Sequence, residues 1–157
     1  MKKFKFTLQP VYNYKLTVEK LQKAELKKAQ DALAALLEEE RRLENMYAET
    51  ERSQSVALEK GENVAMVLSE HDHYFRFLRD ALEEVRIKIV SAEEYKNECE
   101  VRLIRTMKEI KTYIKLRDEQ YQDYMKEVQA EEEKNMGDLV SFKAVSEVAV
   151  ISEGAVR

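Results

Sequence analysis

Apolar residues recur every three or four positions along two long stretches of this chain, and charged residues fill the positions between them. In the second stretch the steps alternate between four and three. This heptad spacing places apolar side chains on one stripe of an α-helix, as in a coiled coil. The expected stripe comprises Tyr74, Leu78, Ala81, Val85, Lys88, Ala92, Tyr95, Cys99, Leu103, Met107, Ile110, Ile114, Arg117, Tyr121, Tyr124 and Val128.

The alternation has two expected irregularities. A step of four from Cys99 to Leu103 predicts a stutter in the second helix. The first stretch contains two runs separated by a one-residue slip. The two runs are Val11, Tyr14, Val18 and Leu21, followed by Leu26, Ala29, Leu33, Leu36, Glu40, Leu43 and Tyr47.

Rare residues mark the expected ends of these helices. Pro10 lacks a backbone N–H and fits the first turn, with Thr7 or Gln9 as the cap. Gly61 interrupts the pattern next, and Ser69 with Asp72 resembles a capping box for a second start. The chain's next glycine, at residue 137, is expected to end the second helix.

These boundaries predict an all-α fold, a long two-helix antiparallel coiled-coil hairpin with a short N-terminal lead and an irregular C-terminal tail. The hairpin covers residues 1–136, with helix one at about 8–57, the tip at about 58–69 and helix two at about 70–136; the tail covers 137–157. A parallel homodimer is the rival architecture, but it leaves Gly61 without a role. The tail is rich in β-branched residues, and the pattern does not distinguish a disordered segment from a short partner-binding strand.

Composition supports helices and argues against most other classes. Ala, Glu, Lys, Leu and Arg supply about half of the residues, which is typical of long helices. Cys99 is the single cysteine, so neither a disulfide framework nor a cysteine metal cluster is expected. The chain contains no stretch of 18 consecutive apolar residues that would span a membrane, and its first residues do not resemble a signal peptide.

Candidate catalytic chemistry is absent from the sequence, and we expect neither an enzyme nor a bound cofactor or metal. No glycine-rich phosphate loop or nucleophile elbow occurs. His71 and His73 point to different sides of a helix, so one metal ion could not use both there. Nucleic-acid binding is disfavoured because the pI is about 5.5 and no aromatic platform accompanies the lysines.

The chain start is basic and aromatic. Phe4 and Phe6 stand among the lysines, which form a cluster that could steer an acidic partner. The lysines are Lys2, Lys3, Lys5, Lys15, Lys20, Lys23, Lys27 and Lys28. Because two helices cannot cover all of the chain's aromatic rings, some rings are expected to form contact surfaces.

Three short motifs resemble the flagellar export protein FliJ family. The lead carries Lys3-Phe4-Lys5-Phe6-x-Leu8-Gln9-x-Val11, followed by Tyr14 and Lys15. After the tip, family-like spacing occurs at His71, Tyr74, Leu78, Ala81 and Leu82, with His71 replacing an aromatic residue. A weaker match is Met136-Gly137-Asp138-Leu139.

The resemblance, which extends to about residue 140, implies a non-enzymatic stalk of the bacterial flagellar type III export apparatus. It implies a cytoplasmic protein at the inner face of the cell membrane. The two seams separated by Gly61 predict a hairpin that is monomeric when free. Its partners would be the export ATPase ring, the membrane export gate and export chaperones. By this resemblance Phe4, Phe6, Tyr121 and Tyr124 would contact the ATPase. Tyr47, Tyr74, Leu78 and Ala81 at the tip would contact the gate.

Two alternative functions remain open at this stage. The equivalent stalk of a virulence type III secretion system shares the layout, and no residue excludes it. A general scaffold coiled coil that dimerises is a different class, which light scattering would separate from a monomeric hairpin.

Overall fold

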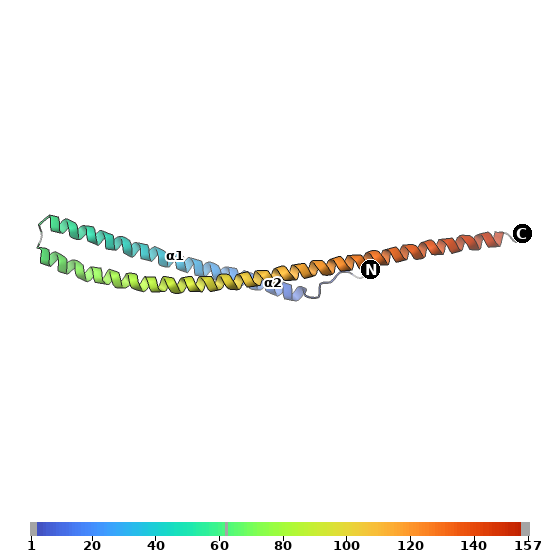
Figure 1. The fold of residues 1–157 in the computed structure, drawn as a ribbon, viewed down its shortest axis with the longest axis horizontal. Helices are drawn as coiled ribbons and strands as arrows, with labels where there is room; N and C mark the ends of the chain where they lie inside the picture. Colours follow the sequence, from blue (N-terminus) through green and yellow to red (C-terminus); the bar gives the residue numbers. More distant parts are fainter. Residues whose placement is uncertain (1–2, 62, 155–157) are drawn as a thin grey trace. The chain divides into compact units, whose positions relative to one another are not determined.

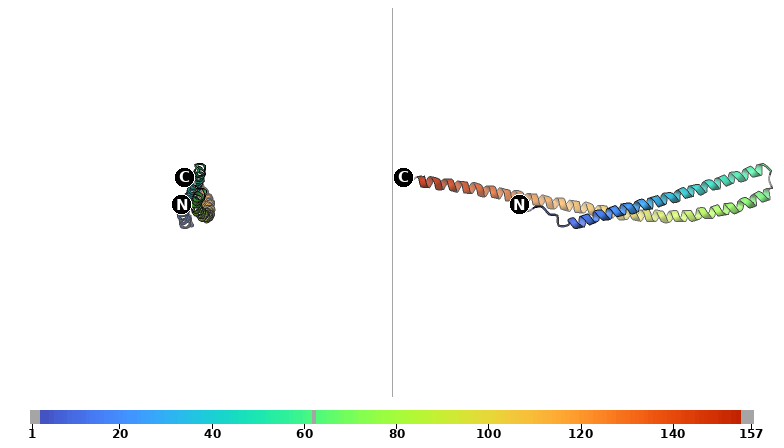
Figure 2. Two further views of the ribbon diagram at one scale, coloured as in Figure 1. Left: turned by 90° about the vertical axis from the view of Figure 1, so that its left-hand side faces the viewer. Right: turned by 180° about the vertical axis from the view of Figure 1, so that it is seen from behind.

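The computed structural model describes residues 3–61 and 63–154, with side chains described up to residue 143. The chain forms two long helices, α1 (Gln9–Glu59) and α2 (Val64–Gly154), and the described residues contain no strand. Two compact units are present. We call residues 16–107 the hairpin unit and residues 1–15 with 108–157 the terminal unit. Within the hairpin unit α1 and α2 run antiparallel side by side (Figures 1 and 2). The all-α hairpin predicted from the sequence is confirmed.

The start of α1 lies where Pro10 predicted it. The Leu8 carbonyl accepts the Tyr12 amide at 3.0 Å, so Leu8 occupies the N-cap position rather than Thr7 or Gln9. Gln9 instead begins the helix, and its side-chain Nε2 donates to Asn13 Oδ1 at 2.9 Å. Pro10 is therefore in the first turn, where its missing N–H leaves no helical hydrogen bond unmade.

The tip is much shorter than predicted. Gly61 has a φ of 76°, a left-handed conformation that favours glycine, and it ends α1. Asn63 then caps α2, since its Oδ1 accepts the amides of Ala65 at 3.1 Å and Met66 at 3.3 Å. The predicted start near Ser69 is wrong because Asn63 already satisfies the first free amides of the helix.

Helix α2 also continues past Gly137, so the predicted irregular tail is helical throughout residues 137–154. Residues 155–157 lie outside the described chain. A glycine inside a helix costs about 1 kcal/mol relative to alanine, which weakens a helix without ending it. Nothing lies within 4 Å of the position that a Cβ at Gly137 would take.

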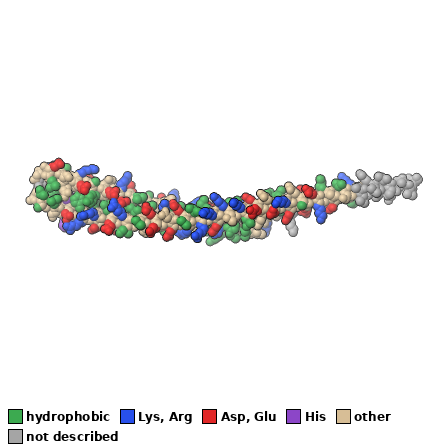
Figure 3. Space-filling model, viewed as in Figure 1, with side chains coloured by type: hydrophobic (Ala, Val, Ile, Leu, Met, Phe, Trp, Pro, Cys, Tyr) green, Lys and Arg blue, Asp and Glu red, His purple; other side chains and the backbone are tan. Residues whose placement is uncertain are grey.

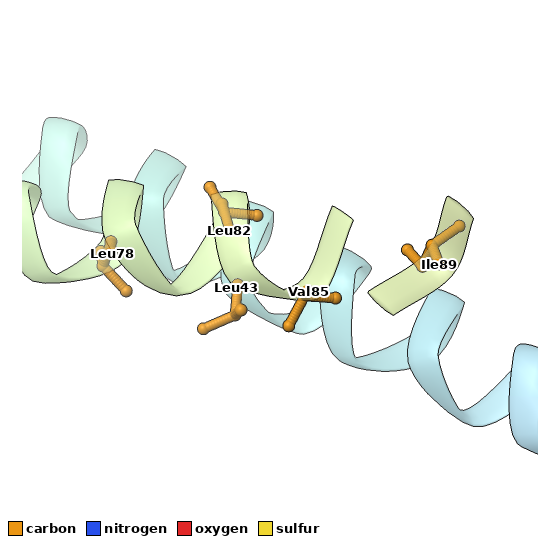
Figure 4. Packing of buried hydrophobic residues seen from close by; sticks show 5 residues of the cluster. All are labelled: Leu43, Leu78, Leu82, Val85 and Ile89. Carbon is orange, nitrogen blue, oxygen red and sulfur yellow. The ribbon is translucent and has the colours of Figure 1, made fainter. Parts of the chain in front are cut away.

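The core of the hairpin unit is an aliphatic cluster. Leu43 from α1 lies among Leu78, Leu82, Val85 and Ile89 from α2 (Figure 4). Half-buried residues complete its edges, namely Leu33, Leu36, Met46, Tyr47 and Ala81. Because α2 supplies four of the five central residues, the apolar stripe of α2 determines which of its faces packs against α1.

The seam on α2 is more regular than predicted. Buried and half-buried residues follow an uninterrupted heptad from His71 to Tyr124, so the expected stutter after Cys99 is absent. Five of the predicted seam positions are exposed, and a residue next to each of them lies in the seam instead. Phe75, Ile89 and Lys96 thus replace Tyr74, Lys88 and Tyr95, and Thr106 and Gln120 replace Met107 and Tyr121.

On α1 the predicted one-residue slip is likewise absent. The seam continues towards the helix start through partly polar positions, which are Tyr12, Lys15, Glu19 and Gln22. The apolar residues Val11, Tyr14 and Leu21 of the first predicted run are exposed, Tyr14 by 65% and Leu21 by 67%. A prediction based on apolar residues alone therefore placed this part of the seam one position away from where it lies.

Ion pairs across the two helices fix the antiparallel register of the hairpin unit. Arg86 contacts Glu40 at 2.7 Å and Glu44 at 3.0 Å. Farther along, Arg102 contacts Glu25 at 3.3 Å, and the Tyr95 hydroxyl donates to the same carboxylate at 2.8 Å. Solvent-exposed pairs of this kind contribute little to stability, because water screens them. They select the register more than they stabilise the fold.

Candidate partner-binding surfaces

An aromatic cluster forms where the N-terminal lead meets α2 in the terminal unit. The Phe4 ring lies 5.2 Å from the Tyr121 ring in a T-shaped arrangement and 5.6 Å from the Tyr124 ring. The two tyrosine rings lie 6.3 Å apart. Edge-to-face pairs at these distances stabilise a contact beyond simple burial. The structure thus brings together three of the four residues expected to contact the ATPase.

The fourth residue, Phe6, has a different role in the structure. Its side chain is buried, and its carbonyl accepts the Gln9 amide at 3.3 Å. Phe6 therefore anchors the lead and helps to begin α1, whereas Tyr121 remains 48% exposed. Of the predicted set, Phe6 is the least accessible to a partner.

A groove of about 850 Å³ runs beside this cluster within the terminal unit. Its lining is mainly the lead and the first turn of α1, together with one cation of α2; the residues are Phe4, Lys5, Phe6, Thr7, Gln9, Pro10, Asn13 and Arg117. The Arg117 guanidinium lies 6.0 Å from the centre of the Tyr12 ring, a cation–π distance. The surface therefore combines rings and positive charge.

Lys15 and Glu109 form the adjoining ion pair of the terminal unit. Lys15 Nζ lies 2.6 Å from Glu109 Oε2. This hydrogen bond raises the pKa of Lys15 above its ordinary value, so the ammonium form is favoured. Lys15 of the basic cluster is thus already paired within the chain, as is Lys23 with Glu19.

The hairpin tip carries the second set of aromatic residues. Tyr47 packs on Phe75 with ring centres 4.9 Å apart, and Tyr74 stacks on Phe77 at 6.2 Å. Phe77 is 61% exposed and Tyr74 is 39% exposed, whereas Tyr47 and Phe75 are half-buried. Hydrophobic side chains are visible among charged ones at this end of the molecule (Figure 3).

Three of the four residues expected to contact the gate pack in or against the aliphatic cluster of the hairpin, and Tyr47 is one of them. Leu78 has no exposed surface, and Ala81 packs against the same aliphatic cluster. Leu78 is therefore a core residue rather than the accessible contact residue that was expected. Tyr74 and the neighbouring Phe77 offer the accessible rings. Phe77 was not among the residues expected to contact the gate, although it lies three residues after Tyr74 and so on the same helical face.

Grooves separate the two helices close to the tip. One of about 810 Å³ is lined by α1 residues between Asn45 and Ala57, by Lys60 just after that helix and by His71 of α2. Another of about 530 Å³ lies between Met46 and Tyr74. The α1 seam offers Thr50, Gln54 and Ala57 here, which are too small or too polar to fill the space. His71 Nδ1 lies 2.8 Å from the Val67 carbonyl, so this ring nitrogen contacts its own helix.

The described residues contain no group of three or more His, Cys, Asp or Glu side chains placed to hold a metal ion. Within the same residues, neither helix has a segment apolar enough to cross a membrane. Comparison with known proteins finds no matching family model, no similar curated protein and no similar solved structure. Candidate function therefore depends on the two aromatic surfaces and on the resemblance of the sequence motifs.

Proposed function

We propose that this chain is a non-enzymatic, stalk-like coiled-coil component of the bacterial flagellar type III export apparatus. In this proposal the terminal unit contacts the export ATPase ring, the tip contacts the membrane export gate, and the stalk escorts export chaperones. The protein would act in the cytoplasm at the inner face of the membrane. The FliJ-like lead motif motivates the proposal.

The observation that best supports the proposal is the contact between Phe4 and the two tyrosines of α2. It joins the lead motif and the second half of the chain in one surface, with Phe4 5.2 Å from Tyr121. Exposed rings beside cations are typical of the centres of protein interfaces, where aromatic residues and arginine are enriched. Arg117 supplies such a cation within the same unit.

Stimulation of the purified export ATPase tests this assignment. Phe4→Ala should lower stimulation severalfold, while Phe142→Ala, which removes a 73% exposed ring in the same unit, should leave it unchanged. Phe4→Ala is preferred to Phe6→Ala because loss of the buried Phe6 would also disturb the lead. An ATPase that neither binds nor responds to the unaltered chain would contradict the proposal.

A binding measurement with the export gate tests the tip separately. Tyr74→Ala and Phe77→Ala should weaken gate binding without a large loss of helix stability, because both rings are exposed. Capture of partners from the native lysate, followed by mass spectrometry, distinguishes flagellar from virulence export components. Recovery of virulence components alone would reassign the stalk to that system.

A further inference from the structure

A second apolar stripe follows α2 on the face that points away from α1. It consists of Ile87, Val90, Val101 and Ile104, exposed by 51–65%, whereas the seam residues Val85 and Ile89 beside them are buried. The steps along the stripe are three, four, three, four and three when Glu94 and Asn97 are included. This is heptad spacing, so α2 has two seams on opposite faces, and among the described residues α1 covers one of them.

From this stripe we infer that two copies of the chain associate through the outer face of α2, antiparallel and around a two-fold axis. The inference is independent of the proposed export function. Each chain keeps its own hairpin, so the assembly differs from the parallel homodimer in which two chains share one coiled coil. It replaces the sequence-based expectation that the free chain stays monomeric.

The stripe is self-complementary when it is read against itself in the opposite direction. Ile87 of one copy then meets Ile104 of the second, Val90 meets Val101, and Glu94 meets Asn97. Every layer thus pairs a residue with one of matching size or polarity. A two-fold axis requires this property, because the same patch must serve both partners.

Charges on the same heptad support the antiparallel direction. Along the sequence Asp80 and Glu83 precede the stripe, and Lys108 and Lys111 follow it. Antiparallel pairing sets each acidic residue against a lysine of the second copy. Parallel pairing in register would instead set Glu83, Glu94 and Lys108 against their own copies, and like charges at such positions are destabilising.

Charged pairs at the two flanks of the stripe affect the strength of the dimer in opposite ways. On one flank Glu84 meets Arg105 of the second copy, a favourable pair. On the other flank Glu93 meets Glu100, a like-charge pair, although Lys96 lies 3.3 Å from Glu100 within each chain. With the polar Glu94–Asn97 layer at the centre, the dimer should be reversible. Such a layer costs stability and specifies register.

The outer face of α2 has grooves that can accept side chains of a second helix. A groove of about 460 Å³ runs beside Ile87 and Val90, and one of about 610 Å³ runs beside Val101. Coiled-coil side chains insert into recesses of this kind on the facing helix. The four apolar residues of the stripe belong to the hairpin unit.

Sedimentation of the full chain over a wide concentration range tests the inference. The unaltered chain should show a monomer–dimer equilibrium, and Val90→Glu should weaken it by at least about tenfold, as expected for a central interface residue. Val56→Glu is the matched control, because Val56 is exposed on α1 away from the stripe. Circular dichroism verifies that each variant keeps its helices. A chain that is monomeric at every concentration, or a dimer that Val90→Glu leaves intact, would overturn the inference.

Charge exchange tests the antiparallel geometry in particular. Glu84→Arg and Arg105→Glu should each weaken the dimer, because each sets like charges opposite one another. The double variant Glu84→Arg/Arg105→Glu should restore most of the lost association, since both pairs re-form with exchanged signs. Additive weakening in the double variant would overturn the arrangement proposed here.

Discussion

The hairpin unit and the terminal unit hold α2 against the rest of the chain with different side chains. In the hairpin unit, aliphatic residues around Leu43 and Leu78 fill the space between two helices. In the terminal unit, rings of the irregular lead meet rings of α2, with Phe4 against Tyr121 and Tyr124. The first contact is closed to solvent, whereas the second leaves ring surface exposed. Stability is therefore expected to reside in the aliphatic cluster, and partner contacts in the aromatic one.

The largest expected effect concerns the centre of the aliphatic cluster. Leu78→Ala should lower the free energy of unfolding by about 2–5 kcal/mol, because a fully buried leucine leaves a cavity. Phe77→Ala is the matched control, and its exposed ring should cost less than about 1 kcal/mol. Thermal melts followed by circular dichroism measure both. Equal losses from the two variants would show that the cluster is not where stability resides.

The second prediction contrasts the two glycines that lie in different units. Gly61→Ala should destabilise by about 1–2 kcal/mol because its φ of 76° is strained for any side chain. Gly137→Ala should instead stabilise α2 by up to about 1 kcal/mol, since it lies within the helix with open space around it. Helicity and melting temperature report both signs. A loss at Gly137 would indicate that the helix ends there after all.

The ends of the helices show what sequence reasoning could and could not supply. Pro10 and Gly61 have backbone requirements that depend on local structure alone, so both were placed correctly. Asn63 and Ser69 are both good capping residues, and local rules do not rank them. The left-handed conformation of Gly61 favours Asn63 over Ser69 as the cap. It ends α1 so abruptly that α2 begins directly after Asn63, whose side chain caps the new helix.

The phase of the seam was harder to predict, because neighbouring residues compete for the same edge of a helix. Tyr74 and Phe75 are both aromatic, and Lys88 and Ile89 both fit an apolar run when the long lysine stem is counted. Which of two neighbouring residues enters the seam depends on the side chains of the facing helix. The sequence of one helix alone does not contain that information. The same ambiguity assigned Leu78 to a partner contact, since a core leucine and an interface leucine have identical spacing.

The third prediction addresses the aromatic contact of the terminal unit. Phe4→Ala should remove about 0.5–1.5 kcal/mol of local stability, which is typical of aromatic pairs. Hydrogen exchange at the Gln9 and Tyr12 amides should speed up, because both bond to carbonyls of the lead. The melting temperature of the hairpin should hardly change. Unaltered exchange at these two amides would mean that the lead is held by Phe6 alone.

The smallest expected effect is a pH dependence within the hairpin unit. The Tyr95 hydroxyl donates to Glu25 Oε1 at 2.8 Å, and this hydrogen bond, with smaller effects of burial and of the Glu25 charge, raises the pKa of Tyr95 above its ordinary value near 10. Arg102 also contacts Glu25, at 3.3 Å. A raised pKa means that the folded state favours the protonated phenol.

The sign of the effect follows from that preference. The contribution of Tyr95 to stability is fully present below pH 10 and is lost as the pH rises through the pKa of the folded state, because the phenolate repels the Glu25 carboxylate. Urea melts of the unaltered chain and of Tyr95→Phe, compared at neutral pH and above pH 10, measure this contribution. The difference in unfolding free energy between the two proteins should shrink at alkaline pH, since Tyr95→Phe has no phenolic proton to lose. A difference that stays constant, or that grows with pH, would show that the Tyr95–Glu25 hydrogen bond does not stabilise this part of the hairpin. The Arg102–Glu25 ion pair would then be the polar interaction that links the two helices at Glu25.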